Sequence, residues 1–322
     1  MGSLATICVY GDPHLSSKNY GAHKNYPKES LELYGKIVEI AKKRNATHVI
    51  GLGDFTYGRF NTLEYRSKVE DMLNELNQIT GNNHYSLMGN HDTATYGMTE
   101  YQYYIANGKI KAPKNFTLGN LHMTMVNYGE LDTAELNIDN ENDKAVNVLL
   151  AHDYLKFKDT VLPHFGTGID LDNFERLFGT DIIICGHIHK IMKFTGTIFK
   201  DGKGQSTGVY YPGCMMRPSY REGHMDDKGQ IIIINVENTG DVSFEIEEFD
   251  LPAIEESFSI EKINERDEKK EAKENRVDIS DIVKDLNEHD RSVGNPEDII
   301  NGLNVDEKYK SKAIELLKTA QG

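Results

Sequence analysis

The chain has 322 residues, 38% of them hydrophobic and 27% charged, a composition that fits one large globular domain with an appendage. No run approaches the roughly 18 consecutive apolar residues of a membrane span, so we expect no membrane association. The formal net charge of −15 repels nucleic acid over most of the surface, so any contact with DNA must rely on bound metal ions, local basic patches or a partner chain.

The first part of the chain alternates short apolar runs with helical patterns. Residues 30–43 and 65–79 repeat apolar positions at the helical period, whereas the shorter runs are typical of buried strands. These strand-like runs are 5–10, 47–52, 84–88, 121–127, 146–151 and 181–185. Their alternation with helices predicts an α/β domain.

After Gly186 the pattern changes to strands without intervening helices. The expected strands are 194–199, 208–211, 231–236 and 242–249, joined by Gly-Asp turns. This predicts an antiparallel meander that forms the second layer of a sandwich. The fold class is therefore α/β, a two-layer β-sandwich flanked by helices, with a short helical C-terminal extension.

The composition shifts again after Pro252, where we place the end of the catalytic domain, 1–252. We expect a charged linker at 253–276, within which residues 261–276 are almost wholly charged and are either a solvated helix or disordered. Two amphipathic patterns follow, at 277–286 and 296–317. They predict a helical module over 277–322.

Metal-binding residue types follow five of the predicted strands. Because the carboxyl ends of strands in an α/β sheet meet at one crevice, we expect these side chains to converge. Seven of them offer oxygen or nitrogen ligands: Asp12, His14, Asp54, Asn90, His152, His187 and His189. His91 and Asp92 directly follow Asn90.

This donor set indicates a particular class of metal site. Oxygen and nitrogen ligands without a thiolate suit manganese, iron, zinc or magnesium rather than a structural Cys-zinc site. Seven ligands are too many for one ion and fit two ions that share a carboxylate, the usual arrangement for phosphate-ester hydrolysis. Each motif alone has an ordinary explanation as a turn, a cap or a core histidine. Five motifs at five strand ends favour the metal site.

The motifs resemble a known superfamily. The series Gly11-Asp12-Pro13-His14, Gly53-Asp54, Gly89-Asn90-His91-Asp92, His152 and Gly186-His187-Ile188-His189 is similar to that of the calcineurin-like metallophosphoesterases, over about residues 5–215. Within it, the chain resembles the SbcD-type DNA repair nucleases, particularly the phage recombination endonuclease branch. Tyr211-Pro212-Gly213-Cys214 resembles that family's Tyr-Pro-Gly-Ser, although Cys214 replaces serine. Few residues follow Pro252 for the DNA-capping domain of larger relatives.

The resemblance implies roles for the strand-end residues. Asp12, His14, Asp54 and His189 would hold one divalent ion, most typically manganese, with magnesium, iron or zinc as alternatives. Asp54, Asn90, His152 and His187 would hold a second, each oxygen of Asp54 taking one ion. His91 would face the phosphate as general acid or as a stabiliser of developing charge. Asp92 would orient His91, the alternative being a helix cap or salt bridge.

The implied function is a metal-dependent DNA nuclease, exonuclease or endonuclease, that hydrolyses phosphodiesters with a water activated by two metals. It would be the nuclease subunit of an SbcC–SbcD-like recombination and repair complex. Its C-terminal helices would bind an SbcC-like coiled-coil ATPase. The alternative is a stand-alone metallophosphatase or cyclic-nucleotide phosphodiesterase.

Further expectations concern assembly, DNA contacts and location. The helix 65–79 lies where this family places its dimer helices, which favours a homodimer unless its apolar stripe faces its own sheet. Cations near the motifs are candidates for the cleft rim, with ordinary solvated surface as the alternative: Lys18, Lys24, Lys28, Arg59, Arg217 and Arg221. Tyr20, Tyr26 and Tyr57 either stack on bases or pack in the core. Three sparse cysteines and no secretory leader favour the cytoplasm, that of the host if the gene is phage-borne.

Overall fold

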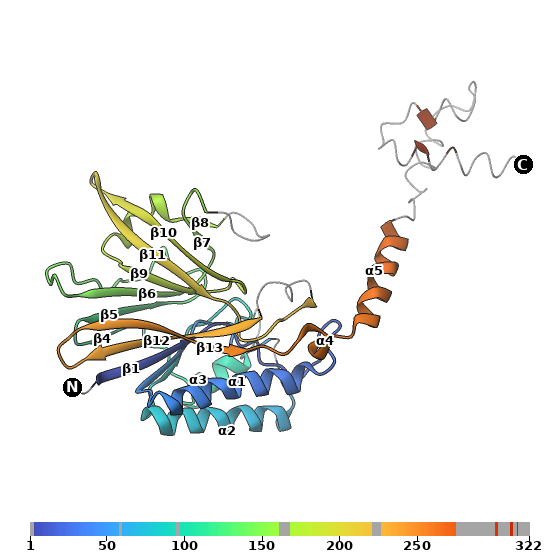
Figure 1. The fold of residues 1–322 in the computed structure, drawn as a ribbon, viewed down its shortest axis with the longest axis horizontal. Helices are drawn as coiled ribbons and strands as arrows, with labels where there is room; N and C mark the ends of the chain where they lie inside the picture. Colours follow the sequence, from blue (N-terminus) through green and yellow to red (C-terminus); the bar gives the residue numbers. More distant parts are fainter. Residues whose placement is uncertain are drawn as a thin grey trace, which may run out of the picture. The chain divides into compact units, whose positions relative to one another are not determined.

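Two β-sheets and three helices build the part of the chain that carries the predicted site (Figure 1). The computed structural model describes residues 3–57, 60–94, 97–160, 168–220, 227–274, 300–301, 310–311 and 314. Residues Met1–Ser259 form one compact unit, and Ile260–Gly322 form a second. The α/β sandwich expected from the sequence is confirmed.

The first sheet has five strands in the order β13-β12-β1-β2-β3. Its strands are β1 (Ser3–Tyr10), β2 (His48–Gly51), β3 (His84–Ser86), β12 (Lys228–Glu237) and β13 (Val242–Asp250). β1, β2 and β3 run parallel, so their carboxyl ends lie at one edge. That edge receives the first three motifs of the predicted site.

The second sheet has six strands in the order β10-β11-β9-β6-β5-β4. Its strands are β4 (Asn115–Leu118), β5 (Leu121–Val126), β6 (Val146–His152), β9 (Ile182–Gly186), β10 (Ile191–Lys200) and β11 (Lys203–Pro212). β5, β6 and β9 are parallel neighbours, which places the histidine motifs after β6 and β9 side by side. A two-stranded sheet, β7 (Leu155–Lys156) and β8 (Ile169–Asp170), and the 3-10 turns η1 (Leu171–Asn173) and η2 (Glu175–Leu177) complete this half.

Alternating side chains divide the interior into separate cores. In β1, Ile7 and Val9 point between the two sheets, where they join Met123 and Leu150 of the second sheet. Cys8 and Tyr10 point the other way, toward the helices. The second sheet is buried on both faces as well, because Leu149 and Ile183 belong to a third apolar cluster. This double burial explains why the strand-like runs are almost continuously apolar.

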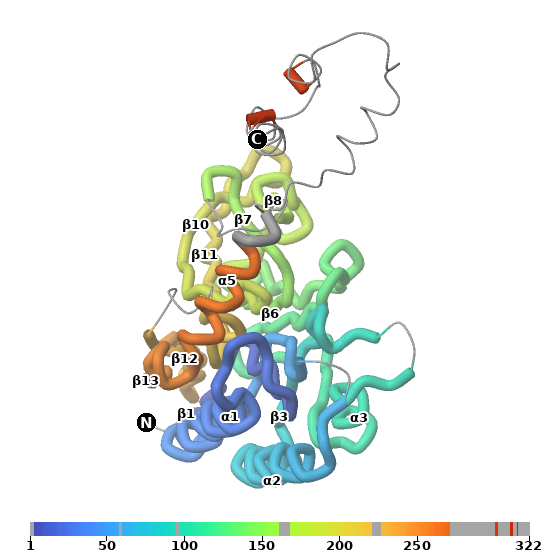
Figure 2. Tube along the Cα trace, turned by 90° about the vertical axis from the view of Figure 1, so that its right-hand side faces the viewer, coloured from blue at the N-terminus to red at the C-terminus, as the bar shows by residue number. Residues whose placement is uncertain are grey.

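The helices cover the outer face of the five-stranded sheet. α1 (Tyr26–Lys43) and α2 (Leu63–Thr80) lie side by side in both views, with α3 (Glu100–Ala106) near them (Figure 1, Figure 2). α1 begins earlier than residue 30, where the sequence pattern placed it, because Asn25 caps the Lys28 amide and Pro27 fits the first turn. α2 is capped by Thr62 and ends at Gly81 in the left-handed conformation.

The predicted four-stranded meander is wrong. β10 and β11 form a hairpin at the edge of the six-stranded sheet, whereas β12 and β13 form a hairpin that pairs with β1 in the other sheet. The four strands therefore belong to two layers rather than one. The local turns were recognisable, but the layer of the β12–β13 hairpin depends on pairing with residues 3–10, more than 200 positions away, whereas β11 pairs with the nearby β9.

The compact first unit extends beyond Pro252. The short helix α4 (Ile254–Ser257) and the following residues attach to the loop after β1. The Lys24 amide donates to the Ser257 carbonyl at 2.8 Å, and the Ser259 amide donates to the Ala22 carbonyl at 2.8 Å. Phe258 is buried with its ring centroid 4.1 Å from that of His23. These contacts explain why the unit ends at Ser259.

The charged stretch contains a helix, α5 (Ile260–Glu274), which settles the choice left open between helix and linker for these residues. The amphipathic patterns at 277–286 and 296–317 lie outside the described residues, apart from helical positions at 300–301, 310–311 and 314. No helix in the described ranges combines the length and apolar character that a membrane crossing requires.

Candidate metal centre

The first two motifs are joined by a continuation of the parallel pairing between β1 and β2. The His14 amide donates to the Asp54 carbonyl at 3.0 Å, and the Leu15 amide donates to the Phe55 carbonyl at 3.0 Å. Tyr26, buried at the start of α1, donates its hydroxyl to the His14 carbonyl at 2.9 Å. The two loops are thus fixed to one another before any ion binds.

Sharp backbone turns bring the ligands to the strand ends. His14, Asp54 and His187 all have positive φ, at 45°, 47° and 78°. Such conformations are strained for residues other than glycine and concentrate at functional sites. Gly53 (φ 104°) precedes Asp54, and a Cβ there would lie 2.5 Å from His152 Nδ1. A Cβ on Gly186 would lie 2.6 Å from Asp12 Oδ1, so both glycines are sterically required.

One group of ligands consists of Asp12, His14 and His189, whose donor atoms lie within 4.8 Å of one another. His14 Nε2 and His189 Nε2 are 2.9 Å apart, and His189 Nε2 lies 3.7 Å from Asp12 Oδ2. Asp12 and His14 are buried, and the His189 side chain is 20% exposed. This group therefore opens to solvent on the His189 side.

The other group consists of Asp54, His152 and His187, again within 4.8 Å. Asn90 joins it, because its Oδ1 lies 3.1 Å from His152 Nε2 and 2.9 Å from His187 Nδ1. His152 Nδ1 is 2.7 Å from the Leu52 carbonyl. The carbonyl accepts a hydrogen bond, so Nδ1 donates and Nε2 faces the ligand group, where its lone pair can bind a cation once that nitrogen is deprotonated.

Asp54 lies between the two groups, but not with one oxygen for each ion as expected. Its Oδ1 accepts the His91 backbone amide at 2.7 Å. Its Oδ2 lies 3.4 Å from His152 Nε2 and 3.9 Å from His14 Nε2. A single oxygen therefore faces both groups, because the other is engaged by the loop that carries Asn90.

The donor atoms fit a pair of cations. Asp12 Oδ1 and His14 Nδ1 are buried without a hydrogen-bond partner in the described structure. Leaving buried polar atoms unpaired is costly, and the Nε2 atoms of His14 and His189, 2.9 Å apart, are close enough to bind the same cation. Oxygen and nitrogen donors that converge in this way are suited to divalent metal ions.

The ionisation of the site reflects the same crowding. Burial raises the pKa of Asp12 to about 6, although the His152 imidazole opposes this shift. Burial also pushes the pKa of Asp54 upward, but the hydrogen bond and charge of His152 outweigh it and the pKa is lowered. Burial lowers the pKa of His187 to about 4, which favours the neutral imidazole that a cation requires.

His91 stands beside the ligands rather than among them. Its ring centroid is 5.2 Å from that of His14 and 4.8 Å from that of Tyr57. Burial lowers its pKa, with Asp54 acting in the opposite direction. The His91 residue as a whole is exposed, so its imidazole is accessible to a molecule that approaches the site.

Asp92 has a different set of partners from the one expected. Its fully buried carboxylate accepts the amides of Phe55, Thr56 and Gly89 at 3.0–3.1 Å. Burial, reinforced by the charge of Asp54, raises its pKa to about 7, whereas the three amides pull it down. Asp92 therefore joins the loop after Asp54 to the loop before Asn90, and Tyr57 rather than Asp92 packs against the His91 ring.

Several supporting residues escaped the sequence interpretation. The Met215 amide donates to the Asp12 carbonyl at 3.0 Å, and the Cys214 amide donates to the His189 carbonyl at 3.2 Å. The segment after β11 thus holds the backbones of two ligand residues through hydrogen bonds. Tyr128, which follows β5, has its ring centroid 5.7 Å from that of His187. Its place after a strand end is the one signal that could have marked it.

The predicted rim cations differ in their surroundings. Arg217 is buried and bonds to the Pro252 carbonyl and to Asp227, so its role is structural. Lys24 donates its ammonium to the Glu255 carbonyl at 2.5 Å, and Lys28 lies 3.5 Å from Glu32. Lys18 is exposed, and Arg59 and Arg221 lie outside the described residues. Of the three tyrosines, Tyr26 is fully buried and cannot stack on a base.

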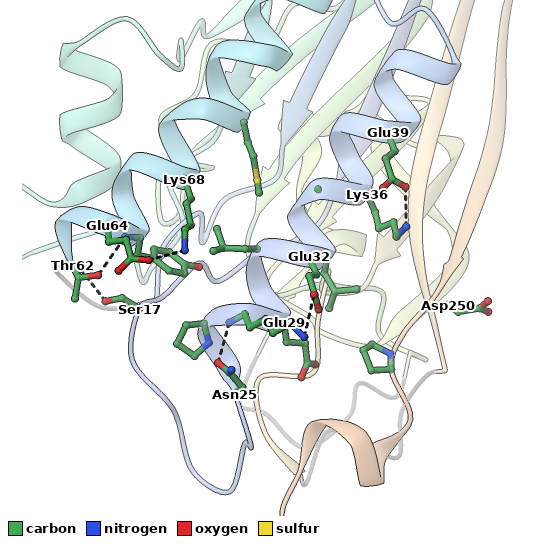
Figure 3. Close-up of a pocket in the computed structure, with 18 residues that line it drawn as sticks. Ser17, Asn25, Glu29, Glu32, Lys36, Glu39, Thr62, Glu64, Lys68 and Asp250 are labelled. Carbon is green, nitrogen blue, oxygen red and sulfur yellow. Dashed lines mark hydrogen bonds and ion pairs between the residues drawn. The ribbon is translucent and has the colours of Figure 1, made fainter.

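A hollow of about 910 Å³ lies away from this chemistry, between α1 and α2 (Figure 3). Its walls include Leu31, Gly35 and Met72, with Lys68 and Glu64 paired at 2.8 Å on one side. None of the seven predicted ligands lines it, and neither does His91 or Asp92. The ligand groups are therefore the better candidate for the catalytic centre.

The comparison with protein-family models agrees with this choice. A family model described as calcineurin-like phosphoesterase matches residues 5–191, a range that contains all seven predicted ligands. No curated protein sequence matches the chain. Among solved structures, a dimetal phosphatase from Danio rerio is similar over 77% of this chain and 98% of that chain, with 10% identity and a TM-score of 0.43.

Proposed function

This chain belongs to the calcineurin-like phosphoesterase family, and from that premise we propose that it is a metal-dependent DNA nuclease. As a family member it is a hydrolase of phosphoesters that uses two divalent metal ions. The finer assignment, to phosphodiesters of DNA, is the proposal. One observation carries it furthest, namely two ligand groups that share one oxygen of Asp54 beside an accessible histidine.

The residues divide between two ions. Asp12, His14 and His189 would hold one, with Asp54. His152, His187 and Asn90 would hold the other, again with Asp54. When bound, the cations would supply the Lewis acidity that activates the attacking water and polarises the phosphate. We take manganese as the working metal, because the resemblance implies it and the three oxygen-donating ligands suit it.

The protein's own contribution is to hold the donors and to place His91. The His91 amide donates to Asp54 Oδ1 at 2.7 Å, and the His91 ring packs against the rings of both His14 and Tyr57. An imidazole N–H held there would donate to a phosphate oxygen or to the departing oxygen. Because the ring is fixed before substrate arrives, little of that interaction is lost to ordering.

Two features support a diester of DNA over a small phosphomonoester. The site is accessible from solvent at His91 and His189 rather than enclosed within the described part of the chain. The segment Tyr211-Pro212-Gly213-Cys214, which carries the resemblance to SbcD-type nucleases, contacts the site directly through the Cys214 amide. Residues 277–322 are then the proposed binding region for a coiled-coil ATPase.

The test compares substrates under one set of metal conditions. Full-length protein with manganese is offered linear DNA, bis(p-nitrophenyl) phosphate and p-nitrophenyl phosphate. The proposal expects cleavage of DNA and of the bis-ester, with much slower release from the monoester. Rapid hydrolysis of the monoester with intact DNA would establish the alternative, a stand-alone phosphatase.

A further inference from the structure

We propose that Tyr128 is the stacking platform for the nucleobase next to the scissile phosphate. The inference rests on the proposed nuclease function and names the substrate group that the site recognises beyond the phosphate. It starts from an exposed aromatic ring. Tyr128 is 41% exposed, yet it lies against the imidazoles of the ligand group that contains His152 and His187.

The position of the ring is defined by two contacts. Its centroid is 5.7 Å from that of His187, with the planes inclined at 36°, and 6.2 Å from that of His152. No hydrogen bond of the Tyr128 side chain occurs within the described part of the chain. Tyr128 thus lies against two candidate metal ligands and remains 41% exposed, so part of its ring is accessible to an incoming group.

The backbone presents Tyr128 rigidly. Its amide donates to the Met88 carbonyl at 2.9 Å, and the Met88 amide donates to Asn127 Oδ1 at 2.9 Å. The Glu130 amide closes a turn onto the Asn127 carbonyl at 3.1 Å, with Gly129 at φ 72°. These hydrogen bonds attach the turn that carries Tyr128 to the segment that leads to Asn90. Turn tips usually carry small polar residues, so a large aromatic side chain at this one is unusual.

The chemistry of the partner follows from the surface of the ring. An exposed aromatic face binds other flat aromatic groups irrespective of their hydrogen-bonding pattern, as in single-strand binding channels. A nucleobase lies one sugar away from its phosphate, and the Tyr128 ring is correspondingly next to the ligand group without belonging to it. His91 contacts His14 of the other ligand group, so the two side chains lie at opposite groups of the site. The base would accordingly lie on the His187 side and the departing oxygen on the His91 side.

The experiment is a comparison of Tyr128 variants on two manganese-dependent substrates. One is a single-stranded oligonucleotide with a normal base at the cleaved position, and the other carries a tetrahydrofuran abasic residue there. We expect Tyr128→Ala to lower kcat/KM about 5- to 100-fold more for the base-bearing substrate than for the abasic one, mainly through KM. Tyr128→Phe should retain the preference. Phe199→Ala, which removes an aromatic side chain that is 51% exposed on the β10–β11 hairpin, should leave both rates unchanged.

Metal content measured on the same samples shows whether Tyr128→Ala acts indirectly, by disturbing metal binding at His187. Equal penalties on both substrates, or loss of metal from Tyr128→Ala, would overturn the stacking role while leaving the nuclease assignment intact. A wild-type protein that cleaves neither oligonucleotide but hydrolyses p-nitrophenyl phosphate would overturn both. A preference for the normal base that vanishes only in Tyr128→Ala would establish the inference.

Discussion

Asp54 is the residue on which the two-ion arrangement depends most directly. Its Oδ2 faces His14 at 3.9 Å and His152 at 3.4 Å, so no neighbouring side chain can replace it. We expect Asp54→Ala to reduce turnover by at least 100-fold with every divalent metal tested. Metal content should fall as well, measured by elemental analysis of the purified protein.

A matched control distinguishes this loss from a general effect of removing negative charge. Asp143 is exposed on the loop before β6, and Asp143→Ala should retain both metal and activity. Retention of more than a few per cent of activity in Asp54→Ala would contradict the two-ion arrangement.

His91 should behave differently, because it donates no ligand atom to either group. We expect His91→Ala to keep its bound metal and to lose roughly 100-fold or more in kcat. The loss should be larger for DNA, whose departing alkoxide needs a proton, than for bis(p-nitrophenyl) phosphate, whose phenolate does not. An equal loss on both substrates would assign His91 to charge stabilisation, and a loss of metal would make it a ligand.

At the scale of residues, the sequence predicts the metal-ligand residues better than it predicts the residues that contact them. All seven ligands occupy strand ends in the structure, and residue type together with strand position was enough to find them. The partners of Asp92 could not be found in the same way, because Asp-amide contacts to Phe55 and Thr56 depend on how two loops meet. Tyr128 was missed because a tyrosine carries no metal-binding signal.

At the scale of elements, β1 and β3 are linked by a buried polar pair. His84 Nε2 lies 3.2 Å from the Tyr10 hydroxyl, and burial lowers the pKa of His84 to about 3 from an ordinary value of 6.5. Between these two pH values the unfolded chain takes up a proton that the folded protein does not. Stability should therefore fall as the pH is lowered from 6.5 toward 3, by up to about 1.4 kcal/mol per pH unit from this group.

Urea unfolding at pH 7.5 and pH 4.5 measures this effect. The wild type should lose about 1–3 kcal/mol more than His84→Gln over that interval, since glutamine does not titrate. His122→Gln, at a partly exposed position of β5, provides the control and should follow the wild type. Identical pH dependence in wild type and His84→Gln would contradict the assignment.

The apolar stripe of α2 is used inside its own unit. Tyr65, Val69, Leu73 and Leu76 belong to the core between the helices and the first sheet. The stripe therefore faces its own sheet, the alternative that the sequence left open. A homodimer stays a prediction, and the stripe no longer supports it. The helical period located the stripe correctly, but periodicity alone does not say which surface it meets.

Leu73→Ala separates the two roles. Leu73 is fully buried in the core, so Leu73→Ala should lower the free energy of unfolding by about 2–5 kcal/mol at every protein concentration. Leu63, 79% exposed on the same helix, is the control, and Leu63→Ala should unfold like the wild type. A concentration-dependent loss in Leu73→Ala, with a change from dimer to monomer in light scattering, would favour an interface instead.

At the scale of the whole molecule, the boundary of the first unit decides how the C-terminal region can be tested. The sequence placed the boundary at Pro252 from the change in composition. The contacts of Ser257, Phe258 and Ser259 with the loop after β1 move it to Ser259. Composition does not reveal that residues 257–259 pack on the first unit, because Phe258 is a single aromatic residue in a mostly charged segment.

Two truncations therefore have different expected outcomes. A chain that stops at Pro252 loses the buried Phe258 and the hydrogen bond from Ser257 Oγ to Glu29 at 3.0 Å. It should be destabilised by about 3–5 kcal/mol, the usual cost of removing a buried phenylalanine. A chain that stops at Ser259 retains these contacts and should unfold like the full-length protein.

The proposed partner-binding role belongs to the residues that both truncations remove. Marginal amphipathic helices gain stability by docking on another chain, so a coiled-coil ATPase fragment should bind the full chain and neither truncated one. Manganese-dependent DNA cleavage should survive in the Ser259 truncation, because every predicted ligand precedes residue 190. If the Ser259 truncation unfolds, residues 260–322 stabilise the first unit rather than recruit a partner, because losing them then costs the fold itself.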